Sequence, residues 1–245
     1  MGLTTIRIFK RLKMRIAGLA TVQLFNLSDF QTLKLPNTQQ MIITVASLKG
    51  GQAKTTTAVH IAALMRQNAP TLLVDGDPNR SALNWHKRKG FPFEVCDERQ
   101  AVKFSREFAH IIFDTQARPN KEDLQVLAGG CDQLIIPLTP DALSLDTLFM
   151  FTDSLKQIGT TQFKVLLTIV PPKPERDGAE VRKALTDAGL PVFAAEIRRY
   201  KVFRKAALAG VLVKDIADDN AESAWNDYAA VAEEIFRTTQ VPAAV

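Results

Sequence analysis

A glycine-rich turn followed by lysine and threonine is the first segment of the sequence that can do chemistry. Residues 48–56 read LKGGQAKTT, after an apolar strand-like run at 42–46 and before a helix expected at 55–67. A turn of this kind at the start of a helix directs backbone N–H groups and the positive end of the helix dipole at a phosphate. We expect Lys54 to reach the β- and γ-phosphates of a nucleotide and the Thr55 hydroxyl to bind Mg²⁺.

Two further strand-like runs end in carboxylates. The run at 71–74 continues into Asp75-Gly76-Asp77-Pro78, and the run at 111–113 ends at Asp114. Phosphoryl transfer depends on positioning and electrostatics, so a carboxylate beside a metal ion suffices for it. Asp114 would hold the metal through a water or the Thr55 hydroxyl. The local alternative for Asp75 and Asp77 is a pair of turn-forming aspartates before a proline.

Short apolar runs alternate with longer segments of helical period along residues 41–237. Such alternation predicts an α/β fold, a single doubly wound domain whose mostly parallel sheet is flanked by helices. In open parallel sheets, ligands bind beyond the carboxyl ends of the strands, where the residues above stand. The expected strands are 42–46, 71–74, 111–113, 133–137, 164–169 and 191–194, and the expected helices are 55–67, 80–89, 121–129, 141–158, 176–188, 201–209 and 221–237.

The chain has 245 residues and a formal net charge of +5, and this surplus lies in residues 1–40. That segment has the pattern of a basic amphipathic helix, suited to an anionic membrane or to DNA phosphates. It also fits an upstream start codon before Met41, or a flexible extension, which leaves 41–245 as the expected domain. Two cysteines and the lack of a long apolar run favour a soluble protein of a reducing, cytoplasmic compartment.

The turn fails the strict pattern G-x-x-x-x-G-K-[ST], because Leu48 and Ala53 stand at its glycine positions. It fits the deviant Walker A pattern K-G-G-x-x-K-[ST] instead, and here the sequence resembles the ParA/MinD family of P-loop ATPases. The resemblance implies an ATP-sandwiched homodimer in which Lys49 crosses to the nucleotide of the partner. The Cβ of Ala53 would slow catalysis or tighten the loop.

The resemblance also implies roles for individual residues. Asp77 would position the attacking water near Mg²⁺, in a motif where Asn79 replaces the usual glutamine, and Asp114 would be the Walker B carboxylate. Gln116 follows Asp114 where the family has proline, and it would contact the γ-phosphate or nothing. The implied catalytic residues are Lys49, Lys54 and Asp77; the metal ligands Thr55, Asp77 and Asp114; and the nucleotide-binding residues Lys49, Gly50, Gly51, Gln52, Ala53, Lys54, Thr55, Thr56, Thr168 and Pro171, the last two for adenine.

Residues 198–205 read RRYKVFRK, with five basic side chains and no acid. Such a surface binds DNA phosphates without reading sequence, and its alternative is a solvated helix face. Residues 87–89 form a second basic cluster that extends it. The proposed DNA-binding residues are Arg198, Arg199, Lys201, Arg204 and Lys205.

The chain resembles the small plasmid-partition (ParF) and carboxysome-positioning (McdA) branches of the family. The resemblance lies in its short length, the segment at 79–85 and the proline-rich loop at 171–174. The expected function is therefore a nucleoid-associated ATPase that binds nonspecific DNA as an ATP dimer. A ParB-like, ParG-like or McdB-like adaptor would stimulate its hydrolysis and so position a plasmid or carboxysome. Two alternatives stay open: a membrane-associated ATPase of the MinD type, and a metabolic P-loop ligase with the same nucleotide site.

Overall fold

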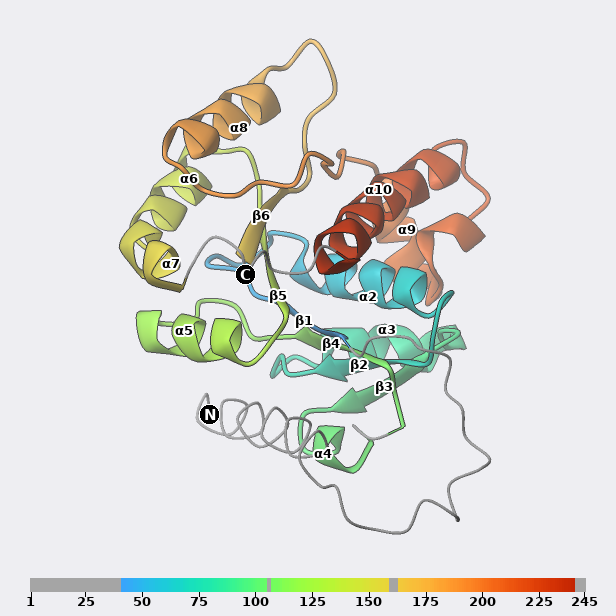
Figure 1. The fold of residues 1–245 in the computed structure, drawn as a ribbon. Coiled ribbons are helices and arrows are strands. Elements are labelled where there is room, and N and C mark those ends of the chain that lie inside the picture. The colour runs from blue at the N-terminus through green and yellow to red at the C-terminus, as the bar shows by residue number, and fades with distance from the viewer. Residues whose placement is uncertain (1–40, 105–106, 159–162, 241–245) are drawn as a thin grey trace, which may run out of the picture.

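A twisted, fully parallel sheet forms the centre of the molecule (Figure 1). The computed structural model describes residues 41–104, 107–158 and 163–240. Within them, six strands pair in the order β3-β2-β4-β1-β5-β6. The strands are β1 Met41–Val45, β2 Thr71–Asp75, β3 Glu94–Asp97, β4 His110–Asp114, β5 Gln133–Leu138 and β6 Phe163–Leu167.

Helices cover both faces of the sheet, as the consecutive apolar residues of the strands require. On β1, Ile43 and Val45 belong to the core beneath one helical layer, whereas Ile42 belongs to the core beneath the other. The first layer contains α2 Lys54–Met65, α3 Ser81–Lys89, α9 Val202–Ala209, the 3₁₀ turn η1 Val213–Asp215 and α10 Ala221–Gln240. The second contains α4 Ala101–Phe104, α5 Lys121–Gly129, α6 Ala142–Phe149, α7 Thr152–Ile158 and α8 Asp177–Asp187.

The predicted fold class is confirmed, and besides the short α4 and η1, which were not expected, the elements differ from expectation as follows. The short edge strand β3 was not predicted, since it begins with exposed Glu94 and ends in Asp97. Segment 191–194 is no strand and contributes a single bridge, Val165 to Val192. The helix expected at 141–158 divides into α6 and α7, where the Phe151 N–H bonds the carbonyl three residues back, at Leu148.

The segment 1–40, expected as a basic extension, lies outside the described residues. Within the part of the chain that is described, no helix combines the length and apolarity needed to cross a membrane.

Candidate nucleotide-binding site

The register of the three central strands brings the predicted carboxylates together. Asp114 at the end of β4 stands level with Asp75 at the end of β2 and with Val45 at the end of β1. The Lys54 ammonium lies 2.7 Å from Asp114 Oδ1 and 3.2 Å from Asp77 Oδ2. The Lys54 side chain is only 7% exposed, so the two carboxylates supply the counter-charge that a buried ammonium requires. The structure thus joins three residues that are separated in the sequence.

The loop 48–54, here called the phosphate loop, leaves the start of α2 uncapped. No side chain of the described residues caps α2, and Ala53 at its N-cap has a left-handed backbone with φ of 58°. Gly51 has φ of 83°, and a Cβ built on Gly50 or Gly51 meets no atom within 4 Å. Open space beside this loop and free N–H groups at the start of α2 fit a bound phosphate.

Asp114 has the environment of a metal ligand. Its carboxylate is completely buried, and Oδ2 makes no hydrogen bond within the described structure. Burial raises the pKa of Asp114 to about 6, against the opposing effect of the Lys54 charge. A buried carboxylate with a free oxygen, next to Asp77 and the Thr55 hydroxyl, provides the oxygen ligands that Mg²⁺ prefers.

Asp75 fixes the backbone that carries Asp77, as the alternative of turn-forming aspartates expected. Its Oδ1 accepts from the Asp77 N–H at 3.0 Å, and its Oδ2 accepts from the Leu83 N–H at 3.0 Å, in the first turn of α3. Asp77 Oδ1 in turn accepts from the Asn79 N–H at 2.9 Å. The pattern Asp-x-Asp at a strand end contained this signal, since Asx turns commonly order such loops.

Lys49 lies apart from the cluster around Lys54. Its ammonium is 3.5 Å from both Asp141 Oδ1 and Ser144 Oγ, at the start of α6, and its side chain is 36% exposed. Although burial opposes the change, hydrogen bonds from Thr139 and Ser144 lower the pKa of Asp141 to about 2. Asp141 is therefore a carboxylate near neutral pH and attracts the lysine.

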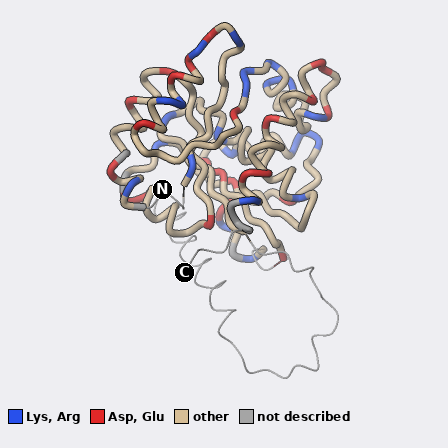
Figure 2. The backbone as a smooth tube through the Cα atoms, turned by 45° about the horizontal axis from the view of Figure 1, so that its top comes forward, with Lys and Arg blue, Asp and Glu red and all other residues tan. Residues whose placement is uncertain are grey.

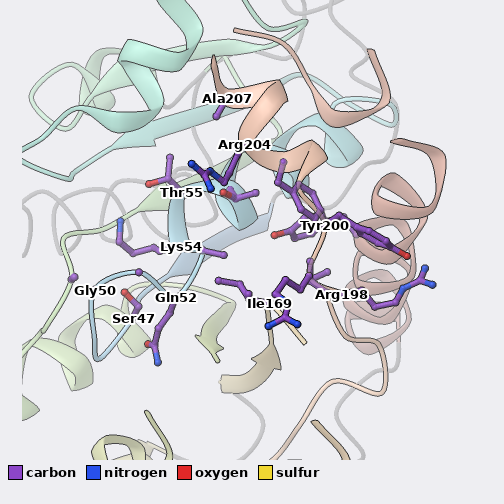
Figure 3. Close-up of a pocket in the computed structure, with 18 of the residues that line it drawn as sticks. Ser47, Gly50, Gln52, Lys54, Thr55, Ile169, Arg198, Tyr200, Arg204 and Ala207 are labelled. Atoms are coloured by element: carbon purple, nitrogen blue, oxygen red, sulfur yellow. The ribbon is translucent and has the colours of Figure 1, made fainter. Parts of the chain in front are cut away.

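A cavity of about 740 Å³ extends from the phosphate loop to the start of α9 (Figure 3). Residues 50–56, Asp77 and Asn79 line its polar part, whereas Ile169, Tyr200 and Phe203 contribute to an apolar part. Gln116 is not among the lining residues, and its neighbour Ala117 is. We call this cavity the nucleotide pocket.

The two residues expected at adenine lie differently from each other. Thr168 is fully buried beneath the phosphate loop, where its hydroxyl donates to the Gln52 carbonyl at 3.3 Å. Pro171 lines a separate depression beside α8. Between them, Ile169 lines the nucleotide pocket with φ of 56°, a left-handed conformation that is rare for a β-branched residue.

The basic segment 198–205 is closer to the nucleotide pocket than its sequence indicates. Arg198 pairs with Asp227 on α10 at 2.6 Å, Arg199 with Glu175 at 3.2 Å and Lys205 with Asp218 at 2.5 Å. Lys201 and Arg204 form no ion pair with any described residue, and both line the pocket. Arg88 of α3 donates to the Ala207 carbonyl of α9, so residues 87–89 adjoin this segment. Figure 2 shows Lys and Arg positions interspersed with Asp and Glu positions along the backbone.

A buried aromatic cluster lies behind the pocket. Tyr228 of α10 lines the pocket and shares a 3.1 Å hydrogen bond with the Thr57 hydroxyl of α2. His60 of α2 stacks on Tyr228 with ring centroids 4.9 Å apart. These contacts join the helix that starts the phosphate site to the C-terminal helices.

Comparisons with known proteins agree with this geometry. Residues 43–213 match the family described as the CobQ/CobB/MinD/ParA nucleotide binding domain. A Maintenance of carboxysome distribution protein A from Gloeobacter kilaueensis is 34% identical over 203 residues, which cover 80% of this chain and 94% of the relative.

Two solved structures illustrate the shared fold. A McdA variant from Cyanothece in complex with ATP has a TM-score of 0.61 and 17% identity, covering 85% of this chain and 99% of that one. Cobyrinic acid a,c-diamide synthase from Mycobacterium smegmatis, with bound ADP and magnesium, has a TM-score of 0.56 and 19% identity, covering 82% and 96%. The chain belongs to the CobQ/CobB/MinD/ParA family of nucleotide-binding proteins.

Proposed function

We propose that this protein is a MgATPase of the McdA type, which dimerises around ATP, binds nonspecific DNA and positions a cargo. The observation that carries the proposal is the Lys54 ammonium between Asp77 and Asp114, beside an uncapped helix start. A cation held by two strand-end carboxylates at an anion-binding helix end is the equipment of phosphoryl transfer. The carboxysome is the proposed cargo because the relative from Gloeobacter kilaueensis is named as a protein that maintains carboxysome distribution.

Each residue has a defined task in ATP hydrolysis under this proposal. Lys54 would turn from the carboxylates to the β- and γ-phosphates, since it ends the phosphate loop and lines the nucleotide pocket. Asp114, Asp77 and Thr55 would hold Mg²⁺, which neutralises charge on the phosphates. Asp77 would also orient the attacking water, because Asp75 and the Asn79 N–H fix its backbone and carboxylate.

Dimerisation would depend on Lys49. Its ammonium has no contact shorter than 3.5 Å with Asp141 or Ser144, so little is lost when it turns to the triphosphate of a second copy. Exposed ion pairs of this kind contribute at most about 1 kcal/mol. Hydrolysis would remove the γ-phosphate that joins the two copies, and nucleotide state would thereby control the dimer.

DNA binding would come from the basic segment 198–205 together with residues 87–89. The ion pairs of Arg198, Arg199 and Lys205 reduce the positive charge that a single copy of the protein presents to DNA phosphates. A dimer doubles the number of basic side chains on one assembly, so the ATP state would bind DNA more tightly than the monomer. An adaptor protein would stimulate hydrolysis at the cargo, and the protein would otherwise reside on the nucleoid.

The test is the affinity of the full chain for duplex DNA of arbitrary sequence, with ATP, ADP or no nucleotide, over a salt series. We expect ATP to raise affinity at least tenfold, with a steep decrease as salt rises. Asp77→Ala should keep ATP-dependent DNA binding and lose hydrolysis, whereas Lys54→Ala should lose both.

Three outcomes would contradict the proposal. The first is equal DNA affinity in all nucleotide states. The second is ATP-dependent pelleting with anionic vesicles in place of DNA binding, which would indicate a MinD-type protein. The third is turnover that needs a small second substrate and ignores DNA, as expected of a ligase.

A further inference from the structure

Among the described residues, Arg204 lies within α9 and lines the nucleotide pocket without an ion pair, and Lys201, which also lines the pocket unpaired, directly precedes the helix. Phe203, Arg204 and Ala207 line the nucleotide pocket at a spacing of one helical turn, while Val202 and Ala206 face the core. Lys205 lies outside the lining and pairs with Asp218 at 2.5 Å. The helical period therefore separates Arg204 from Lys205, although the two are adjacent in the basic segment.

Arg204 is directed at the start of α2. Figure 3 shows its guanidinium extending from α9 toward Thr55, across the nucleotide pocket. It has no acidic partner among the described residues, in contrast to Arg198, Arg199 and Lys205. A free guanidinium facing an uncapped helix start adds a second positive group at a place suited to phosphate, and its planar fork binds phosphate oxygens in pairs.

The position of Arg204 within the pocket indicates which phosphates it meets. Lys54, Asp77 and Asp114 mark the end of the site where the γ-phosphate and metal belong. Ile169, Tyr200 and Phe203 form apolar walls that suit a base. Arg204 adjoins Phe203 in this apolar wall and extends toward the start of α2, so it approaches the phosphates from the side of the base.

We propose that Arg204 binds the α- and β-phosphates of the nucleotide and is a nucleotide-binding residue rather than a DNA contact. The inference rests on the proposed function, because it requires a nucleotide on the phosphate loop. It assigns to one residue of the basic segment a role within a single copy of the chain. Arg198, Arg199, Lys201 and Lys205 then remain the proposed DNA contacts of the segment.

The test measures the affinity of the full chain for Mg-ATP and Mg-ADP by calorimetry, without DNA. Arg204→Ala should weaken both affinities by about tenfold, because α- and β-phosphates are common to ATP and ADP. Arg204→Lys should recover part of the loss. Arg66→Ala is the matched control and should change neither affinity, since Arg66 is an exposed arginine at the opposite end of α2.

Three results would overturn the inference. Unchanged affinity for both nucleotides in Arg204→Ala would return Arg204 to the DNA surface, and DNA titration of the same variant would show the loss there. Loss for ATP alone would place the guanidinium at the γ-phosphate. If the unmodified chain binds neither ATP nor ADP, the proposed function itself fails. This outcome differs from the other two, in which the unmodified chain binds nucleotide and only the response of the Arg204→Ala variant is unexpected.

Discussion

Ala53 has a backbone conformation that glycine adopts far more readily. Its φ is 58°, and Arg80, Arg118 and Ile169 share positive φ values of 52°, 62° and 56°. All four follow strands whose carboxyl ends form or border the site, namely β1, β2, β4 and β6. Strain of this kind collects at functional sites, where the surrounding structure imposes it.

Ala53→Gly should stabilise the protein without nucleotide by about 0.5 to 1 kcal/mol. The substitution removes a left-handed penalty of roughly 1–2 kcal/mol, against a smaller entropic cost of glycine in the unfolded chain. Urea denaturation followed by circular dichroism measures the change. Ala184→Gly in α8 is the control and should cost about 1 kcal/mol, as glycine does inside a helix. Equal destabilisation by both variants would disprove the strain at Ala53.

At the scale of elements, α3 connects the loop after β2, which carries Asp77, to the basic helix α9. It begins at Ser81, directly after the loop that carries Asp77. The Trp85 indole donates to the Val211 carbonyl at 3.0 Å, and Arg88 donates to the Ala207 carbonyl. α3 therefore links the loop of Asp77 to α9 by direct contacts.

Gly210 permits this close packing of α3 and α9. A Cβ at Gly210 would lie 2.3 Å from the Arg88 Cβ and 3.1 Å from the Lys89 N, and its φ is +76°. Gly210→Ala should cost about 2–4 kcal/mol, the sum of left-handed strain and overpacking. Gly189→Ala is a matched control, because Gly189 has φ of +72° with no atom within 4 Å of a built Cβ; it should cost only about 1–2 kcal/mol. Equal denaturation midpoints for the two variants would rule out the steric contribution.

Much of the fold was predictable from local sequence, because consecutive apolar residues and terminal carboxylates mark buried parallel strands. The loop at 48–54 and the position of Asp114 at a strand end were predicted in this way, whereas the role of Asp77 was implied by the family resemblance. The ion pairs of the basic segment were not, since Asp227 lies 29 residues from Arg198 and nothing in the sequence specifies how α10 packs. The edge strand β3 was missed for another reason. Its strand signal is weak, because only two apolar residues stand between exposed Glu94 and half-buried Asp97.

At the scale of the whole molecule, His60 joins three helices of one layer. Its ring is completely buried among Trp85 of α3, Phe203 of α9 and the α10 residues Trp225 and Tyr228. The Nδ1 atom is 2.7 Å from the Thr56 carbonyl, and Nε2 is 3.3 Å from the Val213 N–H. A donor at Nδ1 and an acceptor at Nε2 describe a neutral imidazole.

This neutral imidazole makes global stability dependent on pH. Burial lowers the pKa of His60 to about 4, against the opposing effect of its bond to Thr56. Because the unfolded chain binds this proton near pH 6.5 and the folded chain does not, stability is full above pH 6.5 and is lost as pH falls toward 4. The fully developed loss is about 3 kcal/mol, from a pKa difference of roughly 2.5 units.

His60→Gln should therefore be less stable than the parent protein at pH 7.5 but less sensitive to acid. The amide of glutamine does not titrate, so the decrease in unfolding free energy between pH 7 and pH 4.5 should shrink by about 2 kcal/mol relative to the parent. Burial also lowers the pKa of His110, which is unchanged in both proteins and so cancels in the comparison. Urea titrations at several pH values measure the two decreases. Parallel curves for parent and variant would mean that His60 accepts its proton in the folded state without disturbing the three-helix junction.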